Sequence, residues 1–174
     1  MELGIEESKT GFLRGSWPSA LLIGFTLGQA SLVPPAIAAD ESFIDGLAAF
    51  DAGDVAETLR IWTVLADAGD VNAQVGLAGL HLAGSGVARD PVEAARLYRL
   101  AAESGDSNGQ LNLGRLYLDG VGVERDPAAA YAWLTHAARQ GRRWAEEKRL
   151  AIAPDLSAAE LAAAEALISD IENR

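Results

Sequence analysis

The sequence contains two histidines, and histidine is the residue type best suited to acid–base or metal chemistry. Histidine acts as a general base or a metal ligand when a carboxylate, a cysteine or another histidine lies at suitable spacing. His81 and His136 have no such neighbour at ligand spacing. They stand at positions that Tyr117 and Leu100 occupy in the other copy of an internal repeat, so we interpret both as partly buried packing residues.

Two loops match ligand-binding motifs only in part. Gly84-Ser85-Gly86 has the start of a dinucleotide-binding fingerprint, but no strand is expected before it and Ala88-Arg89 stands where the third glycine is needed. Residues 106–109 begin like a calcium loop but lack its closing acidic residue. The sequence therefore predicts no catalytic residue, no cofactor and no metal site, and we expect that the chain is not an enzyme.

Three tryptophans, Trp62, Trp133 and Trp144, lie on expected helices. Aromatic side chains on helices either pack into the core or form a cage that binds a ligand. The residues around these three give no cage pattern, so we interpret all three as core residues.

Composition excludes several classes of protein. The chain has 174 residues and no cysteine, which excludes disulfides, thiolate metal sites and cysteine nucleophiles. Its net charge is −11, which argues against sequence-independent binding to nucleic acid or to an anionic membrane. Hydrophobic residues make up 49% of the chain but aromatic residues only 6%. Because alanine and leucine dominate the apolar share, we expect an all-α fold.

An internal repeat organises the chain. Residues 71–106 and 107–142 align without a gap and are identical at fifteen of 36 positions. A fixed period of this length is typical of a solenoid, in which each unit buries its apolar face against the next. The sequence therefore predicts an α/α superhelix of stacked helical hairpins.

Local signals place the helices of each unit. Asp90-Pro91 and Asp126-Pro127 each put an N-cap residue before a proline at the first helical position. Glu93 completes a pattern typical of a capping box with Asp90. These helices should end at Gly105 and Gly141 in the left-handed conformation. Before each of these two helices lies another helix, which should end at Gly84 or Gly120. A loop of the form G-x-G-V-x-R-D begins at that glycine. Small residues are expected where helices touch: Ala94, Ala101, Ala102, Ala130, Ala137 and Ala138.

The flanking segments extend this arrangement. Residues 42–70 form a partial unit, with helices expected over 43–50 and 55–66. Residues 143–174 are expected to form capping helices, one over 144–152 that Pro154 stops and one opened by the capping box of Ser157 and Glu160.

The first 39 residues have the pattern of a signal peptide. A polar start with Lys9 and Arg14, an apolar run over 20–27 and a small-x-small end over 36–38 predict cleavage after Ala38 or Ala39. The acidic residues among the first seven are unusual for such a segment. Residues 17–39 are alternatively an uncleaved anchor or a buried helix. We therefore expect a periplasmic or secreted protein, or one anchored on the exported side of the membrane.

The two blocks resemble the Sel-1-like repeat, a TPR-related α/α hairpin of about 36 residues. The carriers in the first copy are Ala73, Leu77, Gly84, Gly86, Val87, Asp90, Ala94, Ala101, Ala102 and Gly105. Those in the second copy are Leu113, Gly114, Tyr117, Gly120, Gly122, Val123, Asp126, Ala130, Trp133, Ala137, Ala138 and Gly141. The resemblance implies a superhelix that binds proteins or peptides and scaffolds assemblies, with no catalytic residues.

Residues on the first helix of each unit, opposite its apolar stripe, are the candidate partner-binding positions. They are Val75, Gly79, Leu111, Asn112 and Arg115. Packing on a neighbouring repeat is the alternative for the apolar ones, and Arg115 beside Asn112 is the better candidate for contact. The predicted function is an exported adaptor or scaffold for a protein or peptide, and the alternative is an accessory or regulatory subunit of a cell-envelope enzyme. We expect no nucleic-acid partner, and membrane contact only through an uncleaved N-terminal segment.

Overall fold

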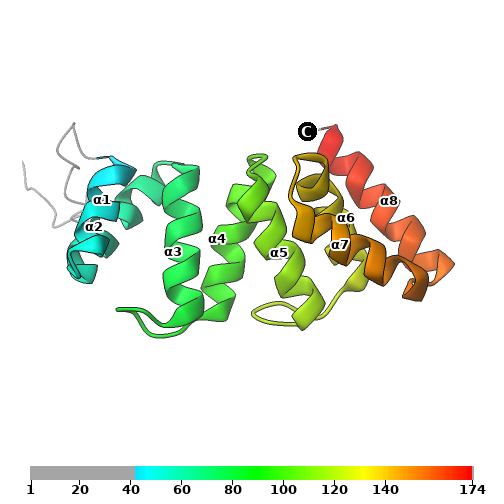
Figure 1. Ribbon diagram of the computed structural model, residues 1–174, viewed down its shortest axis with the longest axis horizontal. Helices are drawn as coiled ribbons and strands as arrows, with labels where there is room; N and C mark the ends of the chain where they lie inside the picture. The colour runs from blue at the N-terminus through cyan, green and yellow to red at the C-terminus, as the bar shows by residue number, and fades with distance from the viewer. Residues whose placement is uncertain (1–41, 174) are drawn as a thin grey trace, which may run out of the picture. The chain divides into compact units, whose positions relative to one another are not determined.

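The computed structural model describes residues 42–173, which all fall in the second of the two units into which the chain divides, residues 34–174. The described residues form eight α-helices, one short 3-10 helix and no strand (Figure 1). The predicted all-α class is therefore confirmed. The predicted signal peptide or anchor, residues 1–39, lies outside the described residues.

The helices form successive hairpins that stack side by side (Figure 1). From α1 to α7, each helix packs mainly on its neighbours in sequence, α3 on α4 within one hairpin and α4 on α5 between hairpins. The bounds are α1 Phe43–Asp51, α2 Val55–Asp67, α3 Val71–Ala83, α4 Pro91–Glu103, α5 Ser107–Asp119, α6 Pro127–Arg139, α7 Arg143–Ile152, the 3-10 helix Ala153–Asp155 and α8 Ala158–Glu172. We call α3, α5 and α7 the A helices, and α4 and α6 the B helices.

Aspartates fix the beginning of the B helices. The Asp90 carboxylate accepts the backbone N–H groups of Val92 and Glu93 at 3.1 and 3.0 Å, and Pro91 follows as the first helical residue. Asp126 caps α6 before its own proline in the same way. The predicted helix starts are confirmed, because an N-cap carboxylate satisfies N–H groups that have no partner in the first turn.

The predicted capping box of α4 is wrong. The Glu93 carboxylate accepts two hydrogen bonds from Arg96 at 2.8 and 2.6 Å instead of the backbone N–H of Asp90. These bonds from Arg96 lower the pKa of Glu93. A guanidinium one turn away is a stronger donor to a carboxylate than a neutral backbone N–H. The predicted capping box of α8, between Ser157 and Glu160, is present.

Small residues make the contacts between helices, as predicted. Ala94, Ala101, Ala130 and Ala137 are fully buried. Helices α4 and α5 approach each other closely at Gly109, where an added Cβ atom would lie 2.7 Å from the backbone nitrogen of Ala102. Larger side chains at these positions would push neighbouring helices apart.

The last helix ends the described stack. Helix α8 packs mainly on α6, and Arg139 of α6 forms an ion pair with Glu172 at the end of α8. Only Ala164 of α8 is buried, so most of its length faces solvent, as expected of a terminal cap. No helix among residues 42–173 has the length and apolar character needed to cross a bilayer.

Candidate functional site

The five predicted partner-binding residues lie on two A helices. Val75 on α3 and Leu111 on α5 are half-buried and pack against the two apolar clusters of the core. These two side chains therefore serve helix packing. Gly79 and Asn112 are partly exposed, and Arg115 is exposed. The structure leaves these last three available for contact with a partner.

The buried side chain of Tyr98 lies near both Gly79 and Arg115. Tyr98 of α4 is only 5% exposed, and its hydroxyl would lie 3.8 Å from a Cβ atom added to Gly79. Burial raises the pKa of Tyr98, and the positive charge of Arg115 acts in the opposite direction. The hydroxyl forms no hydrogen bond with another described residue. Tyr98 is not among the positions predicted from the sequence. The sequence does contain a signal for it, because the equivalent residue of the next unit, Leu134, is apolar.

The prediction that Trp144 belongs to the core is wrong, whereas Trp62 and Trp133 are buried as predicted. Trp144 is 37% exposed at the beginning of α7. Helix α7 continues the order of the A helices, so Trp144 stands one 36-residue period after Asn108. The next residue, Ala145, lies in the core. Extending the 36-residue period past Gly141 would have predicted this exposure.

Two cations contact the Trp144 ring. The Arg115 guanidinium carbon and the Lys148 ammonium nitrogen each lie 5.5 Å from the ring centroid. Cations are attracted to the electron-rich face of an indole at this distance. Asn112 accepts a hydrogen bond from Arg115 Nη1 at 3.3 Å and thereby helps to orient the guanidinium. We define the A-helix surface as Gly79, Asn112, Arg115, Trp144 and Lys148.

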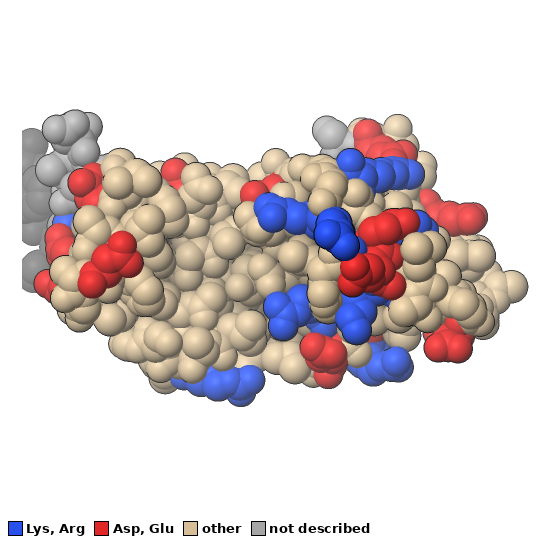
Figure 2. Space-filling view, in the orientation of Figure 1, with Lys and Arg blue, Asp and Glu red and all other residues tan. Residues whose placement is uncertain are grey.

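The acidic residues of α7 are bound to other cations. Glu146 accepts two hydrogen bonds from Arg149 at 2.9 and 3.0 Å, and these bonds lower its pKa. Glu147 lies 4.0 Å from Arg143. Within residues 42–173, neither Arg115 nor Lys148 forms an ion pair. Figure 2 shows charged side chains gathered toward α5–α7 on the face in view, whereas the surface over α3 and α4 is mostly uncharged.

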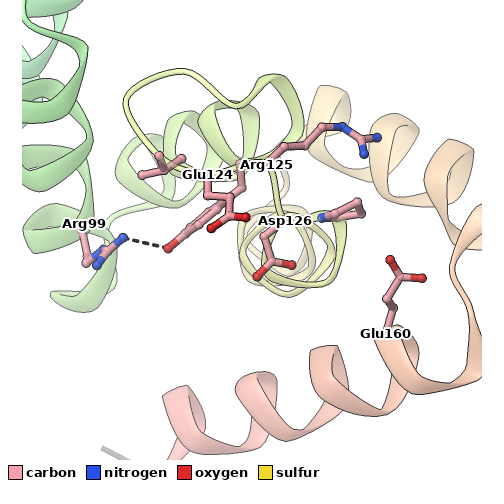
Figure 3. A pocket seen from close by; sticks show the side chains of 8 residues that line it. Arg99, Glu124, Arg125, Asp126 and Glu160 are labelled. Atoms are coloured by element: carbon pink, nitrogen blue, oxygen red, sulfur yellow. Dashed lines mark hydrogen bonds between the residues drawn. The ribbon is translucent and has the colours of Figure 1, made fainter.

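A separate polar recess of about 600 Å³ lies between α4, the α5–α6 loop and α8 (Figure 3). Arg99 donates a hydrogen bond to the Tyr117 hydroxyl at 2.7 Å, and Arg125 donates to the backbone oxygen of Leu118 at 3.2 Å. Asp126 and Glu160 line the recess, but both carboxylates cap helices. The recess offers polar contacts, and its lining gives no nucleophile held by a base.

The two histidines are half-buried, as predicted. His136 lies 6.4 Å from Trp133, measured between ring centroids, and burial lowers its pKa. Among the described residues, no group of three or more histidine, aspartate or glutamate side chains is placed to hold a metal ion.

Comparisons with known proteins agree with this geometry. The Sel1 repeat family matches residues 71–106 and 107–141. A solved structure of a protective antigen from uropathogenic Escherichia coli with an SLR fold is 32% identical, with a TM-score of 0.69 over 74% of this chain. A Sel1 repeat protein from Oxalobacter formigenes is 26% identical, with a TM-score of 0.60 over 64% of this chain.

The chain spans only 28% and 46% of the lengths of these two proteins. A search of curated proteins found no match. The repeat period, the stacked hairpins and the family match all describe the same residues, and the predicted α/α solenoid is confirmed. The chain therefore contains two Sel1 repeats within an α/α solenoid similar to those of solved Sel1-like repeat proteins.

Proposed function

We propose that this protein is an exported adaptor that binds a protein or peptide at the A-helix surface and catalyses no reaction itself. Repeats of the Sel1 family commonly mediate protein–protein interactions, and their fold is typically a non-catalytic scaffold. The observation that carries the proposal is the exposed Trp144, whose ring is in contact with both Arg115 and Lys148. Tryptophan and arginine are enriched among residues that dominate the binding energy of protein interfaces.

The surface has the composition that a binding site requires. Val75 and Leu111 hold the A helices against the core, so the exposed residues stand on a fixed support. Rigid elements lower the entropy cost of binding. The repeats themselves provide the architecture, and the side chains that differ between them provide specificity. Arg115 stands where the preceding unit has Gly79, so the two units present different contacts to a partner.

Export is the second part of the proposal, and its support is the signal-peptide pattern of residues 1–39. We expect the mature protein to begin near Asp40. Mass spectrometry of the intact protein from the envelope and culture fractions checks this, because cleavage after Ala38 or Ala39 removes a known mass. A full-length mass in the membrane fraction would favour the anchored alternative, and a full-length mass in the cytoplasm would contradict export.

Substitution of Arg115 by glutamate tests the site. The protein isolated with its partners from its own envelope fraction, followed by mass spectrometry, should identify a protein partner. Arg115→Glu should weaken that interaction by about tenfold or more, because it removes a charged donor and introduces an opposite charge. Arg96→Glu is the matched control, since Arg96 is an exposed arginine on the B helix α4.

Equal recovery of the partner by wild type and Arg115→Glu would contradict the site assignment. Equal loss with both variants would show a nonspecific charge effect. If the partner is an envelope enzyme whose rate changes when this chain binds, the chain is its accessory subunit, which is the alternative function.

A further inference from the structure

We propose that the partner presents an acidic peptide segment, whose carboxylates bind Arg115 and Lys148 on either side of contacts with the Trp144 ring. This inference rests on the proposed function and names the chemistry of its partner. It concerns the charge of the ligand, which the family match does not define.

Arg115 and Lys148 are cations of a strongly acidic protein. The chain carries a net charge of −11, with 25 acidic and 14 basic residues. Acids are thus in excess, yet Arg115 and Lys148 form no ion pair within the described residues. The neighbouring acids Glu146 and Glu147 are oriented toward Arg149 and Arg143. The two cations are therefore available for carboxylates from outside the described chain.

The two cations lie near each other beside the Trp144 ring. Each lies 5.5 Å from the same ring centroid, so their separation is at most twice that distance. Like charges this close repel each other, and the repulsion falls when carboxylates bind between or beside them. Acidic side chains two or three residues apart on an extended peptide span a comparable distance. An acidic segment therefore fits the spacing better than an isolated neutral group does.

The surroundings of Arg115 leave its guanidinium able to bind a carboxylate. The Asn112 amide oxygen accepts a hydrogen bond from one N–H group of Arg115 and so orients the guanidinium. The other N–H groups of Arg115 are left to donate to a carboxylate. The Tyr98 hydroxyl lies beside Gly79 and has no described hydrogen-bond partner. The site therefore combines charged donors with an aromatic contact.

An array of random ten-residue peptides, blocked at both ends and probed with the intact exported protein, tests the inference. Bound peptides should be enriched in aspartate and glutamate, and their asparagine and glutamine counterparts should bind about tenfold more weakly. Arg115→Gln and Lys148→Gln should each cause a loss of similar size. Arg143→Gln is the matched control, because that side chain is 93% exposed on the same helix, and it should retain binding within about twofold.

Several outcomes would overturn the inference. Equal loss with Arg143→Gln would show that general charge, rather than this site, attracts the peptides. Selection of neutral or basic peptides, or of none, would show that acidic side chains are not the ligand. Binding only to a second array, with the C-terminal carboxylates left free, would assign the two cations to a chain terminus. In each case a partner recovered from the envelope that is sensitive to Arg115→Glu would leave the proposed function standing.

Discussion

Trp62→Ala should lower the free energy of unfolding by about 3–5 kcal/mol, the usual cost of removing a buried tryptophan. Trp62 is 4% exposed, and its ring stacks on Phe43 with centroids 5.0 Å apart. Its indole N–H donates to the backbone oxygen of Phe43 at 3.1 Å. The substitution therefore removes both apolar contacts and a hydrogen bond between α1 and α2.

Two glycines make the space around Trp62 specific to its ring. A Cβ atom would lie 2.3 Å from the Trp62 ring at Gly46 and 2.8 Å at Gly76. These glycines come from α1 and α3, so Trp62 connects the first hairpin to the first full repeat. Neither glycine provides a side chain that could fill the space left by alanine, and a cavity would remain.

Urea denaturation followed by circular dichroism measures this effect. Trp144→Ala is the matched control, because the same substitution at an exposed position should cost about 1 kcal/mol or less. Trp62→Phe should retain much of the stability, since it keeps an aromatic ring. A loss below about 1 kcal/mol for Trp62→Ala would show that the first hairpin contributes little to the stability of the stack.

Gly122→Ala should lower the free energy of unfolding by about 2–4 kcal/mol, through backbone strain and overpacking together. Gly122 has φ +72°, which alanine rarely adopts. Its added Cβ atom would lie 1.9 Å from the backbone oxygen of Pro91. Because the clashing atom belongs to the backbone of α4, the loop of one repeat would have to move away from the preceding repeat.

Gly141→Ala separates the two causes. Gly141 also has a positive φ of +84°, but a Cβ atom there would meet no atom within 4 Å. This control should therefore lose only the conformational part, about 1–2 kcal/mol. Equal losses for the two variants, measured by the same urea denaturation, would show that the contact between Gly122 and Pro91 is not under strain when a methyl group is added.

The contrast between these glycines shows how far the sequence predicts the fold. The repeat pattern predicted a positive φ at the helix end, Gly141, and Gly122 in the loop has a positive φ as well. It did not distinguish the glycine that meets Pro91 from the one that faces open space. That distinction depends on an approach between residues about thirty positions apart in the chain.

The candidate site shows the same division. Arg115, Asn112 and Gly79 could be placed on A helices from the sequence, because helical periodicity determines which face a residue occupies. Their meeting with Tyr98 and Trp144 could not, since it depends on how three hairpins stack. The error at Trp144 had a further cause, because the sequence repeat weakens after Gly141 while the order of helices continues through α7.

The sequence by itself determined the class, the repeat length and the helix boundaries. These depend on N-caps, glycines and apolar spacing, which act over a few neighbouring residues. Only the tertiary structure decided that Glu93 binds Arg96, that Trp62 fits between two glycines and that two cations share the Trp144 ring. Such contacts depend on side-chain competition and on the spacing between packed helices, which no single stretch of sequence specifies.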